Sequence, residues 1–245
     1  MKKTISLFLM SLMGMVGTYA FGTARSDTVE RLQSSVEVIR SIMNTPDKGI
    51  PEEVLADAKC MVVVPHLIKG GFIFGGKHGR GVASCRTSDG WSAPAFVSVG
   101  GGSWGLQIGV EGVDLVILVM NDQGFQHLLS SKFELGADAS AAAGPVGRHA
   151  SADTDWKMNA EILTYSRAKG AFAGLTVEGA SIRQDNDSRN AIYGHKVTTH
   201  ALLLGQVTAP AVAQPFLAAV RGAKAQAVAE GKAEGKAEAK EKDQK

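Results

Sequence analysis

The amino-acid sequence predicts an α+β domain, in which a mainly antiparallel, twisted or barrel-like sheet carries helices at its N- and C-terminal ends. Short strand-like runs separated by glycine-containing turns follow one another closely from residue 60 to residue 120, which is typical of hairpin-connected strands. Stretches with helical periodicity precede and follow them. The 245 residues include 29 glycines and only 6% aromatic side chains, a mix that favours tight turns, while 44% apolar residues supply a sizeable core.

The first 24 residues are typical of a secretory signal peptide, which is removed from the mature protein. Lys2 and Lys3 form a short basic start, an apolar run follows from residue 5 to residue 16, and small residues suited to cleavage come next. An uncleaved anchor is the alternative, but the run is shorter than the roughly 20 residues that cross a bilayer. We therefore expect cleavage near residues 20–24 and a mature protein in the periplasm.

Export bears on the interpretation of the two cysteines. Cys60 and Cys85 each lie in a strand-like run, and an even pair in an oxidising compartment is a candidate disulfide. In the loop-entropy model such a bridge contributes roughly 3 kcal/mol. Two buried free thiols are the alternative. Two cysteines without a nearby histidine do not make a plausible zinc site.

The mature chain is predicted to begin with an amphipathic helix and a linker, within residues 25–50. Asp27 is placed to cap this helix, with a glutamate three residues later in capping-box spacing. Arg31 is expected on the solvent side. The apolar positions that share one face are Val29, Leu32, Val36, Ile39 and Met43. Two interpretations stay open: the helix docks on the domain core, or it lies on a membrane surface, which its mixed charges disfavour.

Residues 51–222 are predicted to form one domain without an internal boundary. A short helix starts at Pro51, where acidic residues in the first turn suit the helix dipole. Asn121 is placed to cap a helix that runs to Ser130. Strands are expected at 60–64, 71–74, 81–86, 95–99, 103–110, 113–120, 162–167 and 171–183, with a turn at Pro65 after the first. Short helices are expected at 187–193, 198–204 and 209–220.

The final segment, residues 223–245, differs in composition from the domain before it. It contains the repeat AEGK-AEGK-AEAK, whose four-residue spacing stacks glutamates over glutamates and lysines over lysines on a helical face. Two glycines in the repeat weaken a helix further. We therefore expect a solvated, mostly disordered tail.

Residues 130–148 combine a strand-like start with a run of small side chains. Such a run suits either a close approach of two backbones or a shallow groove that a ligand fills. We favour close packing, which Gly136, Ala139 and Gly144 permit. Asp138 is expected to accept hydrogen bonds from nearby amides rather than to bind a ligand.

Three glycine-rich stretches spell known signatures, and their context argues against each. GGSWG at 101–105 spells the nucleophile elbow around Ser103, but the strand-like residues 106–110 replace the helix that the elbow needs. The overlapping G-x-G-x-x-G lacks the same helix, whose N-terminus would hold a pyrophosphate. GFIFGGK at 71–77 resembles a phosphate loop, but His78 stands where Ser or Thr is required. A nucleotide ligand is not expected, and a serine hydrolase using Ser103 is a minor alternative.

The other polar residues assemble no recognisable catalytic or metal site. None of the six histidines lies in an HExxH motif. Asp185-Asn186-Asp187 begins like a calcium loop but lacks the third ligand and the glycine turn. The formal net charge of +2 is too weak for strong attraction to nucleic acid. We expect a protein that is not an enzyme and that uses no cofactor, no metal and no nucleic acid.

Positive charge gathers around the glycines that follow the first strand. Cations beside apolar side chains and exposed backbone amides suit an anionic lipid head group. A solvated hairpin tip is the alternative interpretation. The residues concerned are Lys69, Lys77, His78, Arg80 and Arg86, beside Phe72 and Phe74.

Several ordered segments resemble the SYLF domain, a lipid-binding family shared by exported bacterial proteins and eukaryotic actin-patch proteins. They are AKCMVVVP, GGFIFGGKHGRGVASCR, WSAPAF, LVMN, SSKFELGADASAAAGPVGR, ILTYSRAKGAFAGLTVEGASIRQD and AIYG, between residues 58 and 194. The resemblance implies phospholipid binding through a basic surface and an N-terminal amphipathic segment. On this chain the candidate lipid contacts are Lys69, Lys77, His78, Arg80, Phe72, Phe74, Val29, Leu32 and Val36.

These observations together predict a non-enzymatic periplasmic domain that binds anionic phospholipid head groups at a membrane surface. Phosphatidylglycerol, cardiolipin or lipopolysaccharide are the lipids that an exported protein of this kind is expected to meet. The actin-binding activity of the yeast members is not transferred to this chain. The competing hypothesis is an envelope structural or stress protein that acts through protein partners.

Overall fold

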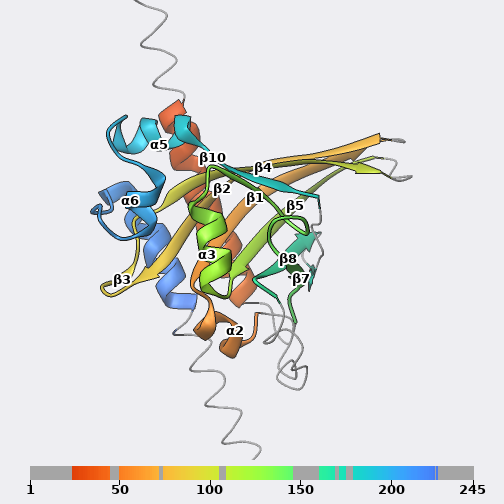
Figure 1. Ribbon diagram of the computed structural model, residues 1–245, viewed down its shortest axis with the longest axis horizontal. Coiled ribbons are helices and arrows are strands. Elements are labelled where there is room, and N and C mark those ends of the chain that lie inside the picture. Colours follow the sequence, from red (N-terminus) through yellow and green to blue (C-terminus); the bar gives the residue numbers. More distant parts are fainter. Residues whose placement is uncertain are drawn as a thin grey trace, which may run out of the picture.

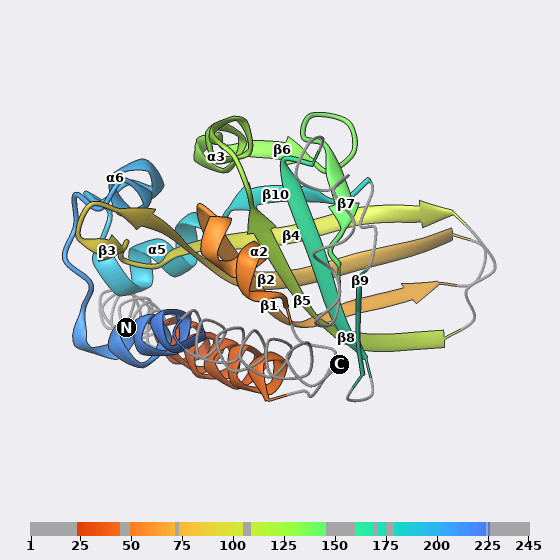
Figure 2. The same cartoon turned by 90° about the horizontal axis from the view of Figure 1, so that it is seen from below.

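The computed structural model describes residues 24–44, 50–71, 74–104, 109–145, 160–168, 171–174, 179–223 and 225. The predicted signal peptide up to residue 23 and the tail from residue 226 lie outside these ranges. A single long sheet runs through the described part, with helices on both of its faces (Figure 1, Figure 2). No helix in these ranges is both long enough and apolar enough to cross a bilayer.

Ten described strands form this sheet, and all but one of their pairings are antiparallel. Along the main path the order is β6-β10-β4-β2-β1-β5-β8-β7, with β3 paired to β2 and β9 paired to β8. The parallel pairing joins β7 to β8. The strands are β1 (Cys60–Gly71), β2 (Phe74–Thr87), β3 (Gly90–Trp91), β4 (Ala95–Trp104), β5 (Gly109–Val119), β6 (Lys132–Glu134), β7 (Ala141–Ala143), β8 (Ile162–Ala168), β9 (Ala171–Gly174) and β10 (Ser181–Gln184). The predicted α+β fold with a mainly antiparallel sheet is therefore confirmed.

The four central strands form two nested hairpins. β1 and β2 make the inner hairpin, while β4 flanks β2 and β5 flanks β1 as the outer pair. Cys60 and Cys85 face each other in register on the inner hairpin, and the structure joins them with an S–S distance of 2.09 Å. The predicted pairing of the two cysteines is thus the one that the strand register brings together.

The two faces of the sheet hold separate apolar cores. Helix 24–43 and helix 214–223 pack across one face, which we call the terminal-helix face (Figure 2). α3 (Asp122–Leu129) and α6 (Thr199–Leu203) pack on the other, which we call the α3 face. Because successive side chains of a strand point to opposite faces, Val63 and Val82 enter the first core, whereas Val62 and Ala83 enter the second.

The N-terminal helix is docked on the domain core in this structure. Leu32 is only 1% exposed and Val36 is also buried, while Val29 is half-buried. The prediction that Asp27 caps the helix is wrong, because the helix already begins at residue 24. The prediction that Arg31 faces solvent is also wrong. Arg31 belongs to a second buried stripe, spaced four and three residues apart, that continues through Ser35, Val38 and Ile42.

A buried ion pair joins this helix to Asp185, which lies 154 residues later in the sequence. The guanidinium of Arg31 donates to the carboxylate of Asp185 at 3.1 Å and to the hydroxyl of Ser188 at 3.0 Å. Arg31 and Asp185 are each 9% exposed. Burial lowers the pKa of Arg31, an effect that the nearby Asp185 carboxylate partly offsets. The helix is therefore held by a charge pair as well as by its apolar face.

The remaining helices were predicted, with boundaries that differ by one to three residues; the last one, expected at 209–220, is a 3-10 turn at 211–213 followed by helix 214–223. Asn121 caps α3 with its side chain, as predicted, and Thr198 caps α6. α5 begins at Asn186, one residue before the expected start, and Asp185 caps it by accepting the backbone N–H of Ser188 at 3.1 Å. The other elements are α2 (Glu52–Asp57), α5 (Asn186–Tyr193) and the 3-10 turn η2 (Ala211–Ala213), which leads into helix 214–223.

Several strand predictions need correction. The range 71–74 is not a separate strand, because Gly71 ends β1 and Phe74 begins β2, and β2 continues through 75–80, where no strand was expected. The range 103–110 is likewise divided between the end of β4 and the start of β5. The predicted turn at Pro65 is absent, because β1 continues through it with a bulge in which His66 has φ of 52°. The backbone N–H of His66 donates to the carboxylate of Asp114 at 3.0 Å, which stabilises the bulge. The predicted strand at 171–183 consists of β9 and β10, and residues 175–178 between them lie outside the described ranges.

The small-residue segment after β6 packs closely against the sheet. β7 pairs in parallel with β8, and a Cβ placed on Gly144 would lie 2.1 Å from the ring of Tyr165. Gly136 has φ of 88°, a conformation that side chains rarely adopt. Asp138 accepts the backbone N–H of Glu134 at 2.8 Å, as the sequence predicted. In the described part of the segment, close packing is therefore the arrangement found.

Candidate functional site

The ends of β1, β2, β4 and β5 that lie nearest the hairpin tips project beyond the helices (Figure 1, Figure 2). We call this part the projecting end; it comprises 68–71, 74–78, 101–104 and 109–112. Glycines occupy facing positions there, since Gly70 pairs with Gly76, and Gly76 with Gly102. Because glycine has no side chain, the backbone at these positions is not covered and is accessible to a ligand.

Lys69 and Lys77 lie directly opposite each other across β1 and β2 at the projecting end. Glu111 is the neighbour of Lys69 on the other side, in β5, and Lys77 extends over Gly101 in β4, where a Cβ would lie 3.2 Å from Lys77 Cε. Partial burial lowers the pKa of both lysines; Glu111 partly offsets the effect on Lys69, and Lys69 lowers the pKa of Lys77 further. This is a partly dehydrated pair of like charges on the α3 face.

His78 and Arg80 project from the opposite face, because they alternate with Lys77 along β2. Both are exposed on the terminal-helix face. Ile68, the register partner of His78, is 54% exposed and supplies a large apolar side chain beside them. Arg80 Nε lies 4.0 Å from the carboxylate of Asp185, the residue that also holds Arg31. The cluster read from the sequence is thus divided between two faces of one hairpin.

The other predicted lipid contacts are not gathered at this place. Phe72 lies outside the described residues, and Phe74 begins β2 without a described side chain. Leu32 and Val36 belong to the core beneath the N-terminal helix, so the docked helix does not present them to a membrane. Phe72, Phe74, Leu32 and Val36 therefore remain predicted lipid contacts that this structure does not test.

Arg86 does not belong to the projecting end and has a structural role. It lies near the other end of β2, where its side chain donates to the carbonyls of Ala58 and Leu55, both at 2.7 Å. Its guanidinium carbon also lies 4.8 Å from the centre of the Trp91 ring. The sequence grouped Arg86 with the cations around the glycines after the first strand, because it could not show how far β2 extends.

Sequence reasoning missed two exposed cations, Arg183 and Lys132. Arg80 of β2 pairs with Ser98 of β4, Ser98 pairs with Arg183 of β10, and Arg183 pairs with Lys132 of β6. All of these positions face the same side of the sheet. Neither Arg183 nor Lys132 forms an ion pair with any residue that the structure describes. No sequence signal could have joined them, since the pairing depends on strands that are distant along the chain.

The catalytic alternatives receive no support from the geometry. Ser103 lies in β4 opposite Gly75, so extended strand occupies the place of an elbow. Asp185 accepts from Ser188 and Arg31, which makes it a helix cap and ion-pair partner rather than part of a calcium loop. Among the described residues, no group of three or more His, Cys, Asp or Glu side chains is arranged to hold a metal ion.

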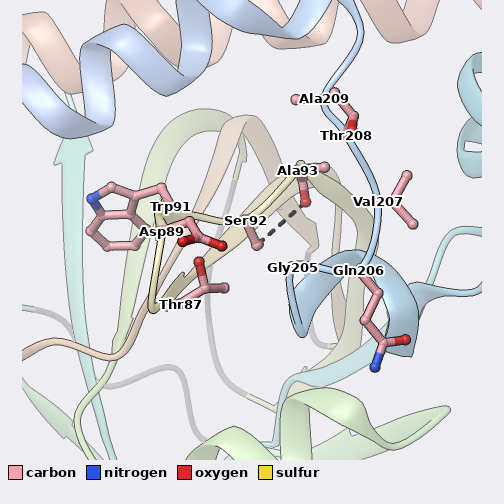
Figure 3. A pocket seen from close by; sticks show the side chains of 10 residues that line it. All are labelled: Thr87, Asp89, Trp91, Ser92, Ala93, Gly205, Gln206, Val207, Thr208 and Ala209. Carbon is pink, nitrogen blue, oxygen red and sulfur yellow. Dashed lines mark hydrogen bonds between the residues drawn. The ribbon is translucent and has the colours of Figure 1, made fainter.

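A shallow hollow lies at the opposite end of β2, between the β3 turn and the segment that follows α6 (Figure 3). Its volume is about 210 Å³. Inside it the Ser92 hydroxyl donates to the Ala93 carbonyl at 3.3 Å. None of the predicted lipid contacts lines this hollow, which includes Thr87, Asp89, Trp91, Gln206 and Val207.

Comparison with known proteins identifies related chains. The family model described as "Ysc84: Las17-binding protein actin regulator" matches residues 100–223. SH3 domain-containing protein PJ696.02 of Schizosaccharomyces pombe is 39% identical over 170 residues, which are 68% of this chain and 39% of the relative. Protein YSC84 of Saccharomyces cerevisiae is 32% identical over 194 residues, 76% of this chain and 41% of the relative.

A mammalian relative gives the same picture. SH3 domain-containing YSC84-like protein 1 of Homo sapiens is 32% identical over 173 residues, which are 70% of this chain and 50% of the relative. The chain thus spans half or less of the length of these three relatives. The family match covers the end of β4, the strands and helices that follow it and the C-terminal helix, and it leaves out β1, β2 and β3. The chain therefore belongs to the Ysc84 family, the SYLF-domain family that its sequence segments resemble.

Proposed function

We propose that this chain is a non-enzymatic, exported domain that binds anionic phospholipid head groups at a membrane surface through its projecting end. The observation that carries the proposal is the facing pair of Lys69 and Lys77. Like charges directly opposite each other in a sheet are destabilising, by up to about 1 kcal/mol. A bound phosphate between them would offset this repulsion and also the loss of hydration that lowers their pKa values.

The surroundings of the lysines suit a lipid surface. Figure 2 shows the projecting end standing clear of the described helices, an arrangement that favours the approach of a planar membrane. The facing glycines leave backbone open, and Ile68, exposed on the opposite face of the same hairpin, offers an apolar side chain that can enter the interfacial region. Glu111 beside Lys69 limits the local positive charge, so we expect moderate affinity that falls as salt is added.

Vesicle co-sedimentation of the purified protein tests this proposal. We expect binding to phosphatidylglycerol-containing vesicles at low salt, and little binding to vesicles of phosphatidylcholine alone. Lys69→Gln combined with Lys77→Gln should weaken binding about tenfold or more, because each lost charge–phosphate contact contributes on the order of 1 kcal/mol. The matched control is Arg40→Gln with Lys196→Gln, which removes the same charge from exposed positions elsewhere. Absence of binding to every anionic vesicle contradicts the proposal.

The periplasmic location and the lack of catalysis belong to the same proposal. N-terminal sequencing of protein recovered from the periplasm should show a start near residues 20–24; a cytoplasmic protein that retains Met1 would contradict export. Incubation with a fluorophosphonate probe should leave Ser103 unlabelled. Labelling that disappears in Ser103→Ala would favour the hydrolase alternative.

A protein partner is the second candidate function, and the names of one relative and of the family model support it. One family member is named LAS seventeen-binding protein 3, and the family model is described as an actin regulator. In this chain the corresponding hypothesis is an envelope protein that acts through another protein. Affinity purification from envelope extracts should distinguish the two functions, because a protein partner would be retained after detergent removes the lipid.

A further inference from the structure

We propose that Arg80, Arg183 and Lys132 form one cationic row that binds a glycerophospholipid carrying two phosphate groups on one head group, of the cardiolipin type. The inference rests on the proposed function and specifies its ligand. It concerns the terminal-helix face, whereas Lys69 and Lys77 lie on the α3 face.

The row is fixed by strand register. Arg80, Ser98, Arg183 and Lys132 occupy successive positions across β2, β4, β10 and β6, so their side chains leave the sheet on one side. Neighbouring strands lie about 4.8 Å apart, which places the strand positions of Arg80 and Arg183 about 10 Å from each other and Lys132 one strand further. Ser98 lies between the two arginines and adds a hydroxyl to the row.

The charges around the row leave it positive. Arg80, Arg183 and Lys132 are exposed, and His78 faces the same side beside Arg80. The acidic groups facing this region are Asp185, 4.0 Å from Arg80, and Glu134, which follows along β6. Asp185 is already paired with Arg31 at 3.1 Å, so it neutralises Arg80 only in part. Arg183 and Lys132 pair with no acid among the described residues.

The length of the row favours two phosphates over one. A single phosphate can contact Arg80 and Arg183 across Ser98, or Arg183 and Lys132, but it is too small to reach both ends of a row that crosses four strands. Two phosphates joined through one glycerol can lie side by side along the row, with Arg183 shared between them. Arginine suits this role because its guanidinium presents donors on two edges.

The experiment compares vesicles of matched charge. Phosphatidylglycerol is included at twice the molar fraction of cardiolipin in phosphatidylcholine, so both vesicles carry the same phosphate charge. We expect the purified protein to bind cardiolipin vesicles about tenfold more tightly, a difference of about 1.4 kcal/mol. Arg183→Gln with Lys132→Gln should abolish this preference, and Arg40→Gln with Lys196→Gln should preserve it.

Each outcome bears on a defined part of the reasoning. Lys69→Gln with Lys77→Gln should weaken binding to both vesicles while the cardiolipin preference survives, which would support two separate contacts. Equal affinity for both vesicles, or a preference that persists in the folded Arg183→Gln, Lys132→Gln protein, overturns the row while leaving the proposed function intact. Absence of binding to any anionic vesicle overturns both. Circular dichroism and thermal melting verify that each variant is folded.

Discussion

Replacing Arg31 with methionine removes the charge that holds the N-terminal helix against α5 while keeping most of the side-chain volume. The variant leaves Asp185 buried, with only Ser188 and the more distant Arg80 to compensate it. Removing one partner of a buried ion pair costs roughly 3–5 kcal/mol. We place this variant at the lower end, about 3 kcal/mol, because the hydroxyl and the backbone N–H of Ser188 still donate to the carboxylate.

Thermal melting followed by far-UV circular dichroism measures the effect. In a protein of this size 1 kcal/mol shifts Tm by about 2–4 °C, so about 3 kcal/mol corresponds to a decrease of roughly 6–12 °C. Arg40→Met is the matched control on the same helix, where the arginine is exposed and pairs with Glu37 at 3.5 Å. An exposed pair of this kind contributes at most about 0.5 kcal/mol.

A second substitution separates the charge from the packing. Asp185→Asn in the Arg31→Met background removes the buried charge but keeps an N-cap side chain, so it should recover part of the lost stability. Equal melting temperatures for Arg31→Met and Arg40→Met would refute the reasoning, because the helix would then be held by apolar contacts alone.

Three further predictions concern the lysine pair, the packing of β7 and the disulfide. Because the pKa values of Lys69 and Lys77 are lowered, both side chains lose their charge at a lower pH than exposed lysines do. Vesicle binding should therefore decrease in the alkaline range below pH 10.5. The double variant Lys69→Arg, Lys77→Arg should keep its vesicle binding over the same range. Gly144→Ala should lower the free energy of unfolding by roughly 1–3 kcal/mol, because its Cβ would clash with the Tyr165 ring. The control Gly222→Ala lies at an open helical position and should be neutral or stabilising by up to about 1 kcal/mol. Urea unfolding measures both, and the reverse order of stabilities would contradict the packing. Replacing both cysteines with serine should lower the free energy of unfolding by roughly 3 kcal/mol and make the melting temperature insensitive to reductant. Detection of two free thiols in the native protein by alkylation would contradict the disulfide.

The sequence predicted those parts of the fold that depend on local patterns. Hairpin spacing indicated an antiparallel sheet, and Asn121 marked the start of α3, because turns and caps are determined by residues close along the chain. Arg31 was predicted to face solvent because arginine side chains are usually exposed, and its partner Asp185 lies far away in sequence.

The candidate site shows more clearly that local patterns do not reveal contacts between residues far apart in the sequence. Lys69 and Lys77 were identified from composition, and alternation along β2 could already have separated Lys77 from Arg80. Arg183 could not be joined to Arg80, because their relation depends on β10 pairing with β4 rather than with any other strand. Register between distant strands is determined by the complete core, and a single sequence contains no direct record of it.

The bond between Arg31 and Asp185 also constrains the order in which the protein folds. The inner hairpin of β1 and β2 is local, so it can form soon after its residues are available. The N-terminal helix, although synthesised first, finds its ionic partner only after 154 further residues. Until then its apolar stripe, which includes Leu32 and Val36, has no complete core to enter. We therefore expect docking of the first helix to be among the last folding steps, and chaperones that bind apolar helices would have access to it throughout that interval.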